Sequence, residues 1–325
     1  MPITGNASYI PTMDDFLAHW QQCNTALGAS PLIIAKPGGP ATNRATFDGV
    51  RTSLLASQST VQDEINDQEI ARGDINLKKA ALLGWLNGFN EVMEAYYQGT
   101  KFFNAKPLAP GIGDGQERFT RPLVDAMSLW GKLDGATAPA GVTLPLTLAD
   151  GTTQVSFVSA VAALQVSYRE ERSAGQDVDL AREDREKYQT DAYDLLKAYR
   201  LAVPPKLALH PSLVATLPRL TPEPGHTPAP VSASAVLVPP DTSHVVHAAS
   251  TDGDLDHYEL EGTAGEVWRE EDAVHLGNHD PNQPNEFTVQ FGLTQPGTAV
   301  TLKVFVVLKT GNRSGSAPLV VRRTV

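Results

Sequence analysis

The tripeptide Arg72-Gly73-Asp74 is the first group of residues whose types could carry a function, because it spells an integrin-type adhesion motif. Such a motif works at the tip of a loop, where both charged side chains project together, whereas here it lies in a helical series. A similar tripeptide further along the chain, Arg182-Glu183-Asp184, keeps the arginine and the aspartate but not the glycine. We therefore interpret the two arginines as structural residues that bridge acidic neighbours on a paired helix.

Five of the eight histidines lie beyond residue 230, at His244, His247, His257, His275 and His279. His275 and His279 are four residues apart with Asp280 adjacent, a spacing that suits zinc on a helix. The segment around them is predicted to be strand or loop, where this spacing has no such meaning, and no glutamate base lies between them. We interpret these residues as surface and strand histidines.

The stretch Asp252-Gly253-Asp254-Leu255-Asp256 has carboxylates at alternate positions, as calcium loops do. His257 stands where the glycine of the sharp turn belongs, and Thr263 stands where the bidentate glutamate belongs. A solvated loop between strands is therefore the favoured interpretation. Weak calcium binding by Asp252, Asp254 and Asp256 stays open, helped by a second acidic loop at 278–286.

No pattern typical of an enzyme or of a cofactor site is present: the sequence lacks a P-loop, a dinucleotide-binding glycine pattern and a Gly-x-Ser-x-Gly elbow. Cys23 is the single cysteine, which excludes a disulfide framework within the chain. His19 lies four residues before it, but the equivalents of His19 and Cys23 in an internal repeat are Leu129 and Leu133, which marks both as core positions. We predict a buried, inert thiol, no cofactor, no metal and no enzymatic activity.

The net charge of −11 argues against nucleic acid as a partner, because no stripe of Lys and Arg is available to bind a phosphate backbone. No apolar run approaches the roughly 18 residues of a membrane span. The first residues have neither a basic region nor an apolar region of a secretory signal. These features predict a cytoplasmic protein, or a protein at the cell surface or outside the cell by a non-Sec route.

The internal repeat indicates the elements that would position these residues. Equivalent residues of its two halves are separated by a constant number of residues, without a gap. Asp15 and Trp20 recur as Asp125 and Trp130, and Ala71-Arg72 recurs as Ala181-Arg182. Further pairs at the same offset are Phe47 with Phe157, Leu54 with Leu164, Ser57 with Ser167 and Leu86 with Leu196. Repeated helical units build shape or surface, since each buries its apolar stripe on its neighbour. We expect Trp20 and Trp130 to occupy equivalent packed positions.

The helical half begins with a predicted helix over 11–28, capped by Thr12 and ended by Gly28, and a Pro/Gly-rich loop over 36–40 follows. A proline-free stretch then carries a seven-residue apolar series over 44–98, typical of a coiled-coil-like seam. The series consists of Phe47, Leu54, Val61, Gln68, Ile75, Leu82, Phe89 and Tyr96. Gly73 leaves two alternatives, one continuous helix or a hairpin broken at Gly73, and we prefer the continuous helix.

The second half restarts with a predicted helix over 118–134, an extended piece over 143–149 and a long helix over 153–201 that Pro204-Pro205 ends. Pairing the two long helices antiparallel would bury both seams. The residues expected between the helices are Phe47, Leu54, Leu82, Leu86, Phe157, Leu164 and Leu196. The prolines of 203–230 then indicate a stiff, extended linker.

Beyond this linker the periodicity changes from seven to two. Alternating or β-branched runs, separated by Gly, Asp, Asn and Pro clusters, indicate a β-sandwich. The runs are 245–248, 257–260, 287–291 and 300–308. Two segments resemble parts of a fibronectin type III domain. One is 256–260, in the position of a third strand. The other is the run 299–307, followed by the hairpin loop 309–314 and a last strand at 318–321. The Trp expected in its second strand is replaced by Val245-Val246-His247.

The overall layout resembles that of uncharacterised bacterial proteins in which a long-helix region precedes one such sandwich. The fold class is therefore expected to be a duplicated all-α, bundle-like region followed by an all-β sandwich. The expected domains are a helical domain over 1–203, with repeats at about 11–98 and 121–201, a linker over 204–229 and a sandwich over 230–325.

Two functions fit these expectations. The first is a non-enzymatic structural or assembly protein, a helical rod that presents the sandwich to a protein partner or to another copy of itself. The alternative is a surface module that binds a glycan or a protein, with the helices as a stalk and with Trp268, Tyr258 and the acidic loops as its binding groups. The identity of the partner and the oligomeric state do not follow from the sequence.

Overall fold

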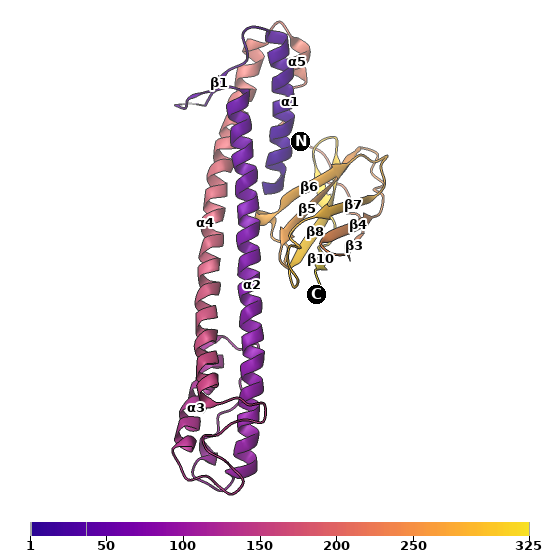
Figure 1. The fold of residues 1–325 in the computed structure, drawn as a ribbon. Coiled ribbons are helices and arrows are strands. Elements are labelled where there is room, and N and C mark those ends of the chain that lie inside the picture. The colour runs from indigo at the N-terminus through magenta and orange to yellow at the C-terminus, as the bar shows by residue number, and fades with distance from the viewer. Residues whose placement is uncertain (1, 37, 325) are drawn as a thin grey trace. The chain divides into compact units, whose positions relative to one another are not determined.

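The computed structural model describes residues 2–36 and 38–324; Met1, Val325 and Pro37 of the predicted Pro/Gly-rich loop lie outside the described residues. Long helices are followed by antiparallel strands, which is the predicted fold class (Figure 1). The chain forms two compact units. Unit 1 combines the chain up to Asp67 with the chain from Gln176 onward, and unit 2 is Gln68–Gly175.

Two helices of 53 residues each, α2 (Arg44–Tyr96) and α4 (Gln154–Lys206), contribute to both units. α2 is continuous through Gly73, as preferred from the sequence. Both helices begin at equivalent caps: the Asn43 side chain accepts the Thr46 N–H at 2.9 Å, and the Thr153 hydroxyl accepts the Ser156 N–H at 3.3 Å.

The predicted end of the second long helix at Pro204-Pro205 is wrong, because both prolines lie inside the last turn of α4. A helix tolerates prolines where their fixed φ already matches the helical value, and the loss of two N–H donors is confined here to the end of the helix. The Leu207 N–H still reaches the Val203 carbonyl at 2.9 Å.

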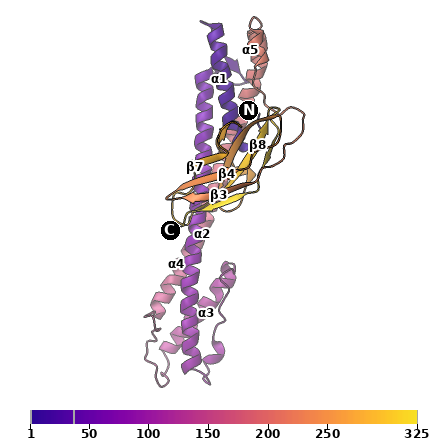
Figure 2. The ribbon, with the colours of Figure 1, turned by 90° about the vertical axis from the view of Figure 1, so that its right-hand side faces the viewer.

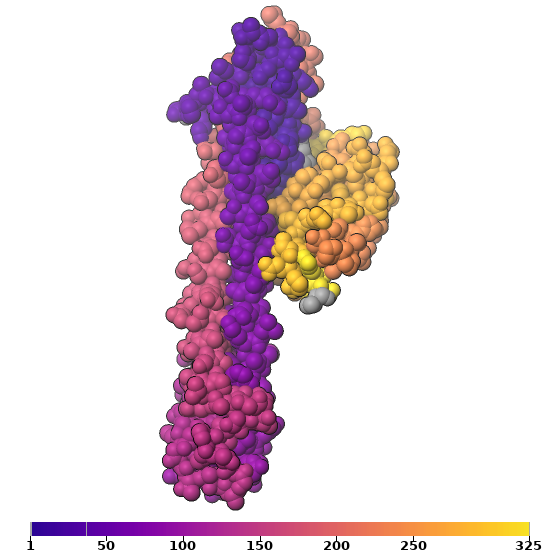
Figure 3. All heavy atoms as spheres, viewed as in Figure 1, coloured from indigo at the N-terminus to yellow at the C-terminus, as the bar shows by residue number. Residues whose placement is uncertain are grey.

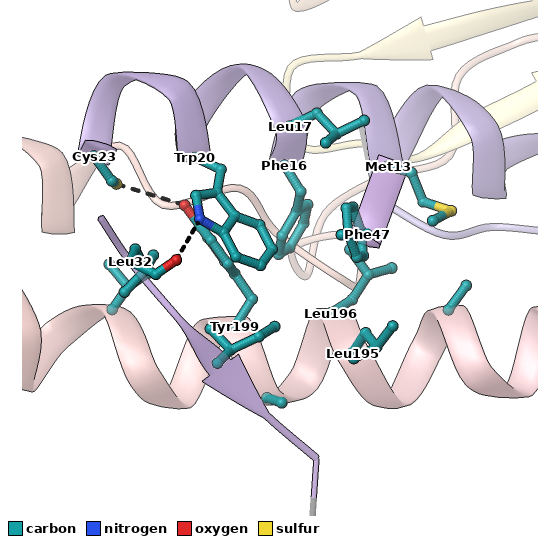
Figure 4. Packing of buried hydrophobic residues seen from close by; sticks show 14 of the residues in the cluster. Met13, Phe16, Leu17, Trp20, Cys23, Leu32, Phe47, Leu195, Leu196 and Tyr199 are labelled. Atoms are coloured by element: carbon teal, nitrogen blue, oxygen red, sulfur yellow. Dashed lines mark hydrogen bonds between the residues drawn. The ribbon is translucent and has the colours of Figure 1, made fainter. Parts of the chain in front are cut away.

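The helical core of unit 1 is built by α1 (Tyr9–Leu27) together with the start of α2 and the end of α4. Trp20 packs against Phe47 and Tyr199, and its indole N–H donates to the Leu32 carbonyl at 3.1 Å (Figure 4). Gly28 ends α1 with a φ of 61°, which a side chain would oppose. Thr12, the predicted cap, lies inside α1, because Pro11 is tolerated in a first turn and the helix starts earlier.

The core of unit 2 is built in the same way by α3 (Gln116–Asp134), the start of α4 and the end of α2. Trp130 packs against Phe157 and Phe89, and its indole N–H donates to the Leu146 carbonyl at 3.2 Å. All residues predicted to lie between the helices are buried: Phe47, Leu54, Leu82, Leu86, Phe157, Leu164 and Leu196.

The segment expected to be an extended linker contains a short helix, α5 (Pro211–Ala215), and packs onto the core of unit 1. Leu207 is buried there, and Leu213, Leu217 and Leu220 are half-buried against the same core. Proline stiffness alone does not keep such a segment extended when its leucines can cover an apolar surface. The domain boundaries at 203 and 230 stay a prediction.

The sandwich consists of two antiparallel sheets around one apolar core (Figure 2). One sheet has the order β3 (Ala233–Val238), β4 (Thr242–His247) and β7 (Glu286–Gln290). The other has the order β10 (Leu319–Arg322), β8 (Ala299–Leu308), β5 (Leu255–Ala264) and β6 (Val274–His279), with β9 (Arg313–Gly315) also paired to β8. All four runs of alternating residues identified in the sequence form strands.

The remaining elements are short. They are the strands β1 (Ile34–Ala35) and β2 (Ala41–Thr42) and the 3-10 turns η1 (Asn6–Ser8), η2 (Phe103–Ala105) and η3 (Glu270–Asp272). In the described part of the chain, no helix combines the length and the apolar character needed to cross a membrane.

Candidate functional site

Two central strands of the sandwich, β5 and β8, are buried on both of their faces. Along β5 every residue from Tyr258 to Ala264 is buried, and along β8 only Lys303 is not fully buried. In a two-sheet sandwich one face of each strand meets the opposite sheet, so the other face needs a further cover. Tyr258 and Leu260 point into the core, and the alternating Glu259 and Glu261 must therefore lie on the outer face.

Part of the cover of this outer face comes from the helices and the N-terminal segment of unit 1, and part comes from the sandwich's own Trp268, whose ring lies 6.3 Å from that of Phe305 on β8. The Asn6 amide donates to the Glu271 carbonyl at 2.6 Å, and the Gln58 amide donates to the Asn6 carbonyl at 3.3 Å. Atoms of the sandwich and of the N-terminal part of the helical region are in contact in the space-filling view (Figure 3). The outer face of β5 and β8 is thus a docked surface.

The strongest docking contact joins η3 to α4. The Asp272 side chain is fully buried and accepts two hydrogen bonds from Arg182, from Nε at 3.0 Å and from Nη2 at 2.5 Å. Arg185 adds a third contact at 3.4 Å and is itself buried. Charge-assisted pairs with two parallel hydrogen bonds are among the strongest polar contacts in proteins. The hydrogen bond to Asp272 is the main cause that raises the pKa of Arg182.

The side chain of Gln62 on α2 completes this contact. Its amide nitrogen donates to the Asp272 carbonyl at 2.7 Å, and its amide oxygen accepts the Ala264 N–H at 2.8 Å. A small apolar cluster lies beside it, formed by Val61, Ile65, Val178, Ala181 and Ala264. We call Gln62, Arg182, Arg185, Ala264 and Asp272 the clasp.

A second group on the docked face is a buried charge cluster around Arg313 of β9. Its guanidinium binds Glu259 Oε2 at 3.2 Å and also the carboxylate of Glu261, and it lies 4.3 Å from the centre of the Phe305 ring. Burial raises the pKa of Glu261 to about 7 and outweighs the opposing effect of Arg313. The second oxygen of Glu261, Oε2, is buried without a hydrogen-bond partner.

His257 joins this cluster through two carboxylates. Its Nε2 lies 2.8 Å from Glu259 Oε1 and its Nδ1 lies 2.8 Å from Asp256 Oδ2. Carboxylates only accept hydrogen bonds, so the ring donates from both nitrogens as a cation. Burial acts to lower the pKa of His257, but Glu259 and Asp256 outweigh it and the net direction is upward. Burial acts to raise the pKa of Glu259, but His257 and Arg313 outweigh it and the net direction is downward.

The histidines considered for zinc are not brought together. His279 instead lies against His247, with the two Nε2 atoms 3.0 Å apart. The Nδ1 atoms lie 2.9 Å from the Ala248 carbonyl and 3.0 Å from the Asp280 carbonyl and donate to them. Burial is the main cause that lowers the pKa of His247, and the neighbouring His279 acts in the same direction.

Two of the three acidic residues considered for calcium, Asp252 and Asp256, are engaged with protein groups. Asp252 accepts hydrogen bonds from His226 and from the Ala229 N–H, and Asp256 pairs with His257. Within residues 2–36 and 38–324, no group of three or more His, Cys, Asp or Glu side chains is arranged to hold a metal ion. Calcium binding by Asp252, Asp254 and Asp256 stays a prediction for titration.

The adhesion tripeptide lies within α2, with no loop around it. Arg72 pairs with Glu171 of α4 at 3.0 Å and with Glu69 at 2.8 Å, so it bridges to the paired helix as interpreted from the sequence. Asp74 accepts hydrogen bonds from Lys78 and from the Ser167 hydroxyl. The equivalent Arg182 departs from that interpretation, because its main partner is on the sandwich.

His19 and Cys23 are both buried, as their apolar equivalents indicated. His19 Nε2 lies 2.8 Å from the Leu213 carbonyl and therefore donates to it, and the Tyr199 hydroxyl lies 2.7 Å from His19 Nδ1. Cys23 Sγ is 3.5 Å from the Tyr199 hydroxyl (Figure 4). Burial is the main cause that raises the pKa of Cys23, which keeps the thiol protonated.

Of the clasp, only Arg182 was singled out from the sequence, and there as a bridge to a paired helix rather than to the sandwich. Asp272 stands in the acidic run Glu270-Glu271-Asp272, which resembles any solvated loop, and Gln62 has no special spacing. The sequence signal that could have found them is a difference between the two repeats. Arg185 is equivalent to Ile75, and Gln62 is equivalent to Arg172, so residues of different chemistry occupy equivalent positions in the two repeats.

Comparison with known proteins finds no matching family model and no matching curated protein. Solved structures match over about a third of the chain. A Fn3-like protein from Clostridium thermocellum is 17% identical, with a TM-score of 0.25, and the match covers 30% of this chain and 94% of that chain.

Two further solved structures match over a similar share of the chain. A domain fragment of titin is 18% identical over 34% of this chain and 35% of its own, with a TM-score of 0.24. The FN1–FN3 domains of chicken CNTN1 are 13% identical over 33% of both chains, with a TM-score of 0.26. The similarities carry no argument about function. The sandwich itself, with a three-stranded sheet facing a five-stranded sheet in the order described, has the layout of a fibronectin type III-like domain.

Proposed function

We propose that this chain is a non-enzymatic structural protein that holds its fibronectin type III-like sandwich by one sheet and presents the other sheet to a protein partner, in the first place another copy of itself. The observation that carries the proposal is the contrast between the two sheets. The outer face of β5 and β8 is buried, whereas the outer face of the β3–β4–β7 sheet is exposed and carries three valines.

The exposed sheet has the chemistry of a protein-contact surface. Val236 and Val238 alternate along β3, and Val246 lies opposite Ser234 on the same face; the three side chains are 57%, 44% and 44% exposed. On this face the His244 ring donates a hydrogen bond from Nε2 to Glu286 Oε2 at 3.1 Å. Exposed apolar groups on a sheet with edge strands favour association with another chain.

The polar clusters support a non-catalytic role. The clasp and the Arg313 cluster join one element of the fold to another, and His19, Tyr199 and Cys23 join helices to the segment that follows α4. For the alternative, a glycan-binding module, Tyr258 is unsuitable as a stacking ring because it is buried and its hydroxyl accepts the Ser250 N–H at 2.6 Å.

The test is size-exclusion chromatography with light scattering over a concentration series. We expect the mass of the wild-type protein to rise above 34.8 kDa with concentration, and Val236→Asp combined with Val246→Asp to abolish that rise. Val267→Asp, at a 65% exposed position of the same sandwich outside this sheet, is the matched control and should behave as the wild type. A wild-type protein that stays monomeric throughout would exclude self-association.

A calcium titration and a glycan array test the alternative function. Binding in either assay that survives the two valine substitutions would place the ligand elsewhere and favour the surface-binding module.

A further inference from the structure

The contact between the sandwich and the helices of unit 1 has a substantial polar part. Ion pairs and amide hydrogen bonds lie beside the small apolar cluster around Val61 and Val178. A cavity of about 380 Å³ remains between α2 and the sandwich, lined by Gln58, Gln62, His275 and Phe291 among others. Polar, incompletely filled interfaces within one chain are typical of parts that move relative to each other.

Glu261 is the least satisfied charged group on the docked face. One guanidinium, that of Arg313, serves the carboxylates of both Glu259 and Glu261, and it also lies 3.5 Å from Glu270. The Oε2 atom of Glu261 is buried without a partner. A buried carboxylate with an unpaired oxygen is costly, and the neutral acid at the same position costs less because it carries no charge.

The N-terminal segment closes the cluster without supplying a charge. An added side-chain carbon at Gly5 would lie 3.2 Å from Arg313 Nη2 and 3.2 Å from Glu270 Oε1, so the backbone there lies directly on the cluster. Asn6 beside it contributes only neutral amide groups. The titratable and charged groups that face Glu261 or its neighbours are Arg313 of β9, Glu259 and His257 of β5, His275 of β6, Glu270 of η3 and, acting on His275, Asp14 of α1.

We propose that the sandwich docks reversibly on the helices and the N-terminal segment, and that docking takes up a proton on Glu261, so that a rise in pH loosens the clasp and releases the outer face of β5 and β8. This regulates which sheet of the sandwich is accessible and goes beyond the proposed function. Its test does not measure self-association, so the docking proposal and the proposed function can each be contradicted independently of the other.

The direction follows from linkage. Burial raises the pKa of Glu261 to about 7 in the docked state, and undocking would expose the outer face to water and lower this pKa, so the contribution of the proton to docking is present at low pH and is lost as the pH rises through 7. His257 and His275 act in the opposite direction, because burial acts to lower the pKa of both, and the carboxylates that raise the pKa of His257, those of Glu259 and Asp256, belong to β5 itself. Replacing Glu261 alone separates its contribution from the two histidines.

The reporter is the amide of Ala264, which donates to the Gln62 side chain only when the sandwich is docked. Hydrogen exchange of this amide is measured by NMR in the full chain from pH 5.5 to 8, and the intrinsic exchange rate is divided out. We expect the opening constant of the wild type, relative to that of Glu261→Gln, to rise roughly tenfold over this range. The amide of Val245, in the core of the sandwich, should show no such change and reports that the sandwich stays folded.

The matched control is Glu286→Gln, on the opposite sheet, which should keep the pH dependence of the wild type. A pH dependence that is the same in the wild type and in Glu261→Gln would overturn the proposal. If Glu261→Gln does not fold, the proposal is tested on the wild type alone, by following the NMR signal of the Glu261 carboxyl carbon against pH. This carboxyl should titrate near pH 7, and titration below pH 5 would equally overturn the proposal.

Discussion

The core around Trp20 and the core around Trp130 are the two regions whose comparison says most about this molecule. The Trp20–Phe47 rings are 5.6 Å apart at 41°, and the Trp130–Phe157 rings are 5.8 Å apart at 41°. Each core takes its third ring, Tyr199 or Phe89, from the far end of the other long helix. Phe47 and Phe157 are separated in the sequence by the same number of residues as the two tryptophans, and so are Phe89 and Tyr199.

The loops that close the two cores match as well. Asn24 and Asp134, again at the offset of the two tryptophans, accept the N–H groups of Leu32 and Leu146 at 2.8 and 2.6 Å. The carbonyls of the same two leucines accept the tryptophan N–H groups. The matching environments support the predicted internal repeat, since composition alone would not reproduce hydrogen bonds on both sides of one residue.

The difference between the cores lies at three positions. His19, Cys23 and Tyr199 in one core stand where Leu129, Leu133 and Phe89 stand in the other. The polar group occurs in the core onto which the segment after α4 folds, and that segment brings the Leu213 carbonyl toward His19. A buried carbonyl needs a donor, so the polar residues mark where a further piece of chain was accommodated.

The same lesson applies to the two equivalent arginines. Each has an acidic neighbour three residues earlier, Glu69 or Asp179, but Arg72 then binds Glu171 whereas Arg182 binds Asp272 of the sandwich. Around Arg182 the helices carry Val61 and Val178, which the sandwich contacts; the equivalent residues are Glu171 and Gln68. The stretch of the two long helices in unit 1 is thus a docking surface, and the equivalent stretch in unit 2 is polar.

The prediction with the largest expected effect tests whether the two tryptophan cores are packed alike. Trp20→Ala and Trp130→Ala should each lower the free energy of unfolding by about 3–5 kcal/mol, because both remove a fully buried ring and one hydrogen bond. Urea unfolding monitored by hydrogen exchange of amides in each core is the measurement. A loss above about 2 kcal/mol for one variant with almost none for the other would show that the two environments are not equivalent.

The next effect tests the difference between the two arginines. Asp272→Ala leaves Arg185 buried without its ion-pair partner and should cost about 3 kcal/mol in unit 1. Glu171→Ala, the control on the exposed pair with Arg72, should cost less than about 1 kcal/mol. Thermal unfolding of the two variants gives the comparison, and similar losses would mean that the clasp is not a special contact.

A smaller effect tests the reason for the polar core. His19→Leu should cost about 1–3 kcal/mol, because the Leu213 carbonyl and the Tyr199 hydroxyl lose their partner. Adding Tyr199→Phe and Cys23→Leu, which reproduces the composition of the other core, should restore part of that loss. Denaturant unfolding of the single and triple variants decides it; a triple variant less stable than the single one would contradict the explanation.

The smallest effect concerns the adhesion tripeptide. Arg72→Ala should change the free energy of unfolding by less than about 1 kcal/mol, since its ion pairs are solvent-exposed. Cell adhesion to immobilised protein, compared between the wild type and Asp74→Glu, checks the functional side. We expect no difference, because the tripeptide lies in a continuous helix; adhesion lost on substitution would restore the motif as a functional site.

The sequence by itself determined the elements of this protein and their buried faces. A seven-residue period from Phe47 to Phe89 predicts which side of a long helix is apolar, and alternation along 300–308 predicts a strand, because both follow from the local geometry of the backbone. Equivalent residues such as Trp20 and Trp130 then predicted similar packing.

The tertiary structure alone decided what those elements contact. That β5 is buried on both faces, that Asp272 meets Arg182 and that Leu213 covers His19 are contacts between parts of the chain that lie far apart in the sequence. A periodic pattern records which face of an element is apolar but not which partner covers it. A buried ion pair leaves no apolar signal at all, because its residues are those of a solvated surface until another part of the chain removes the water.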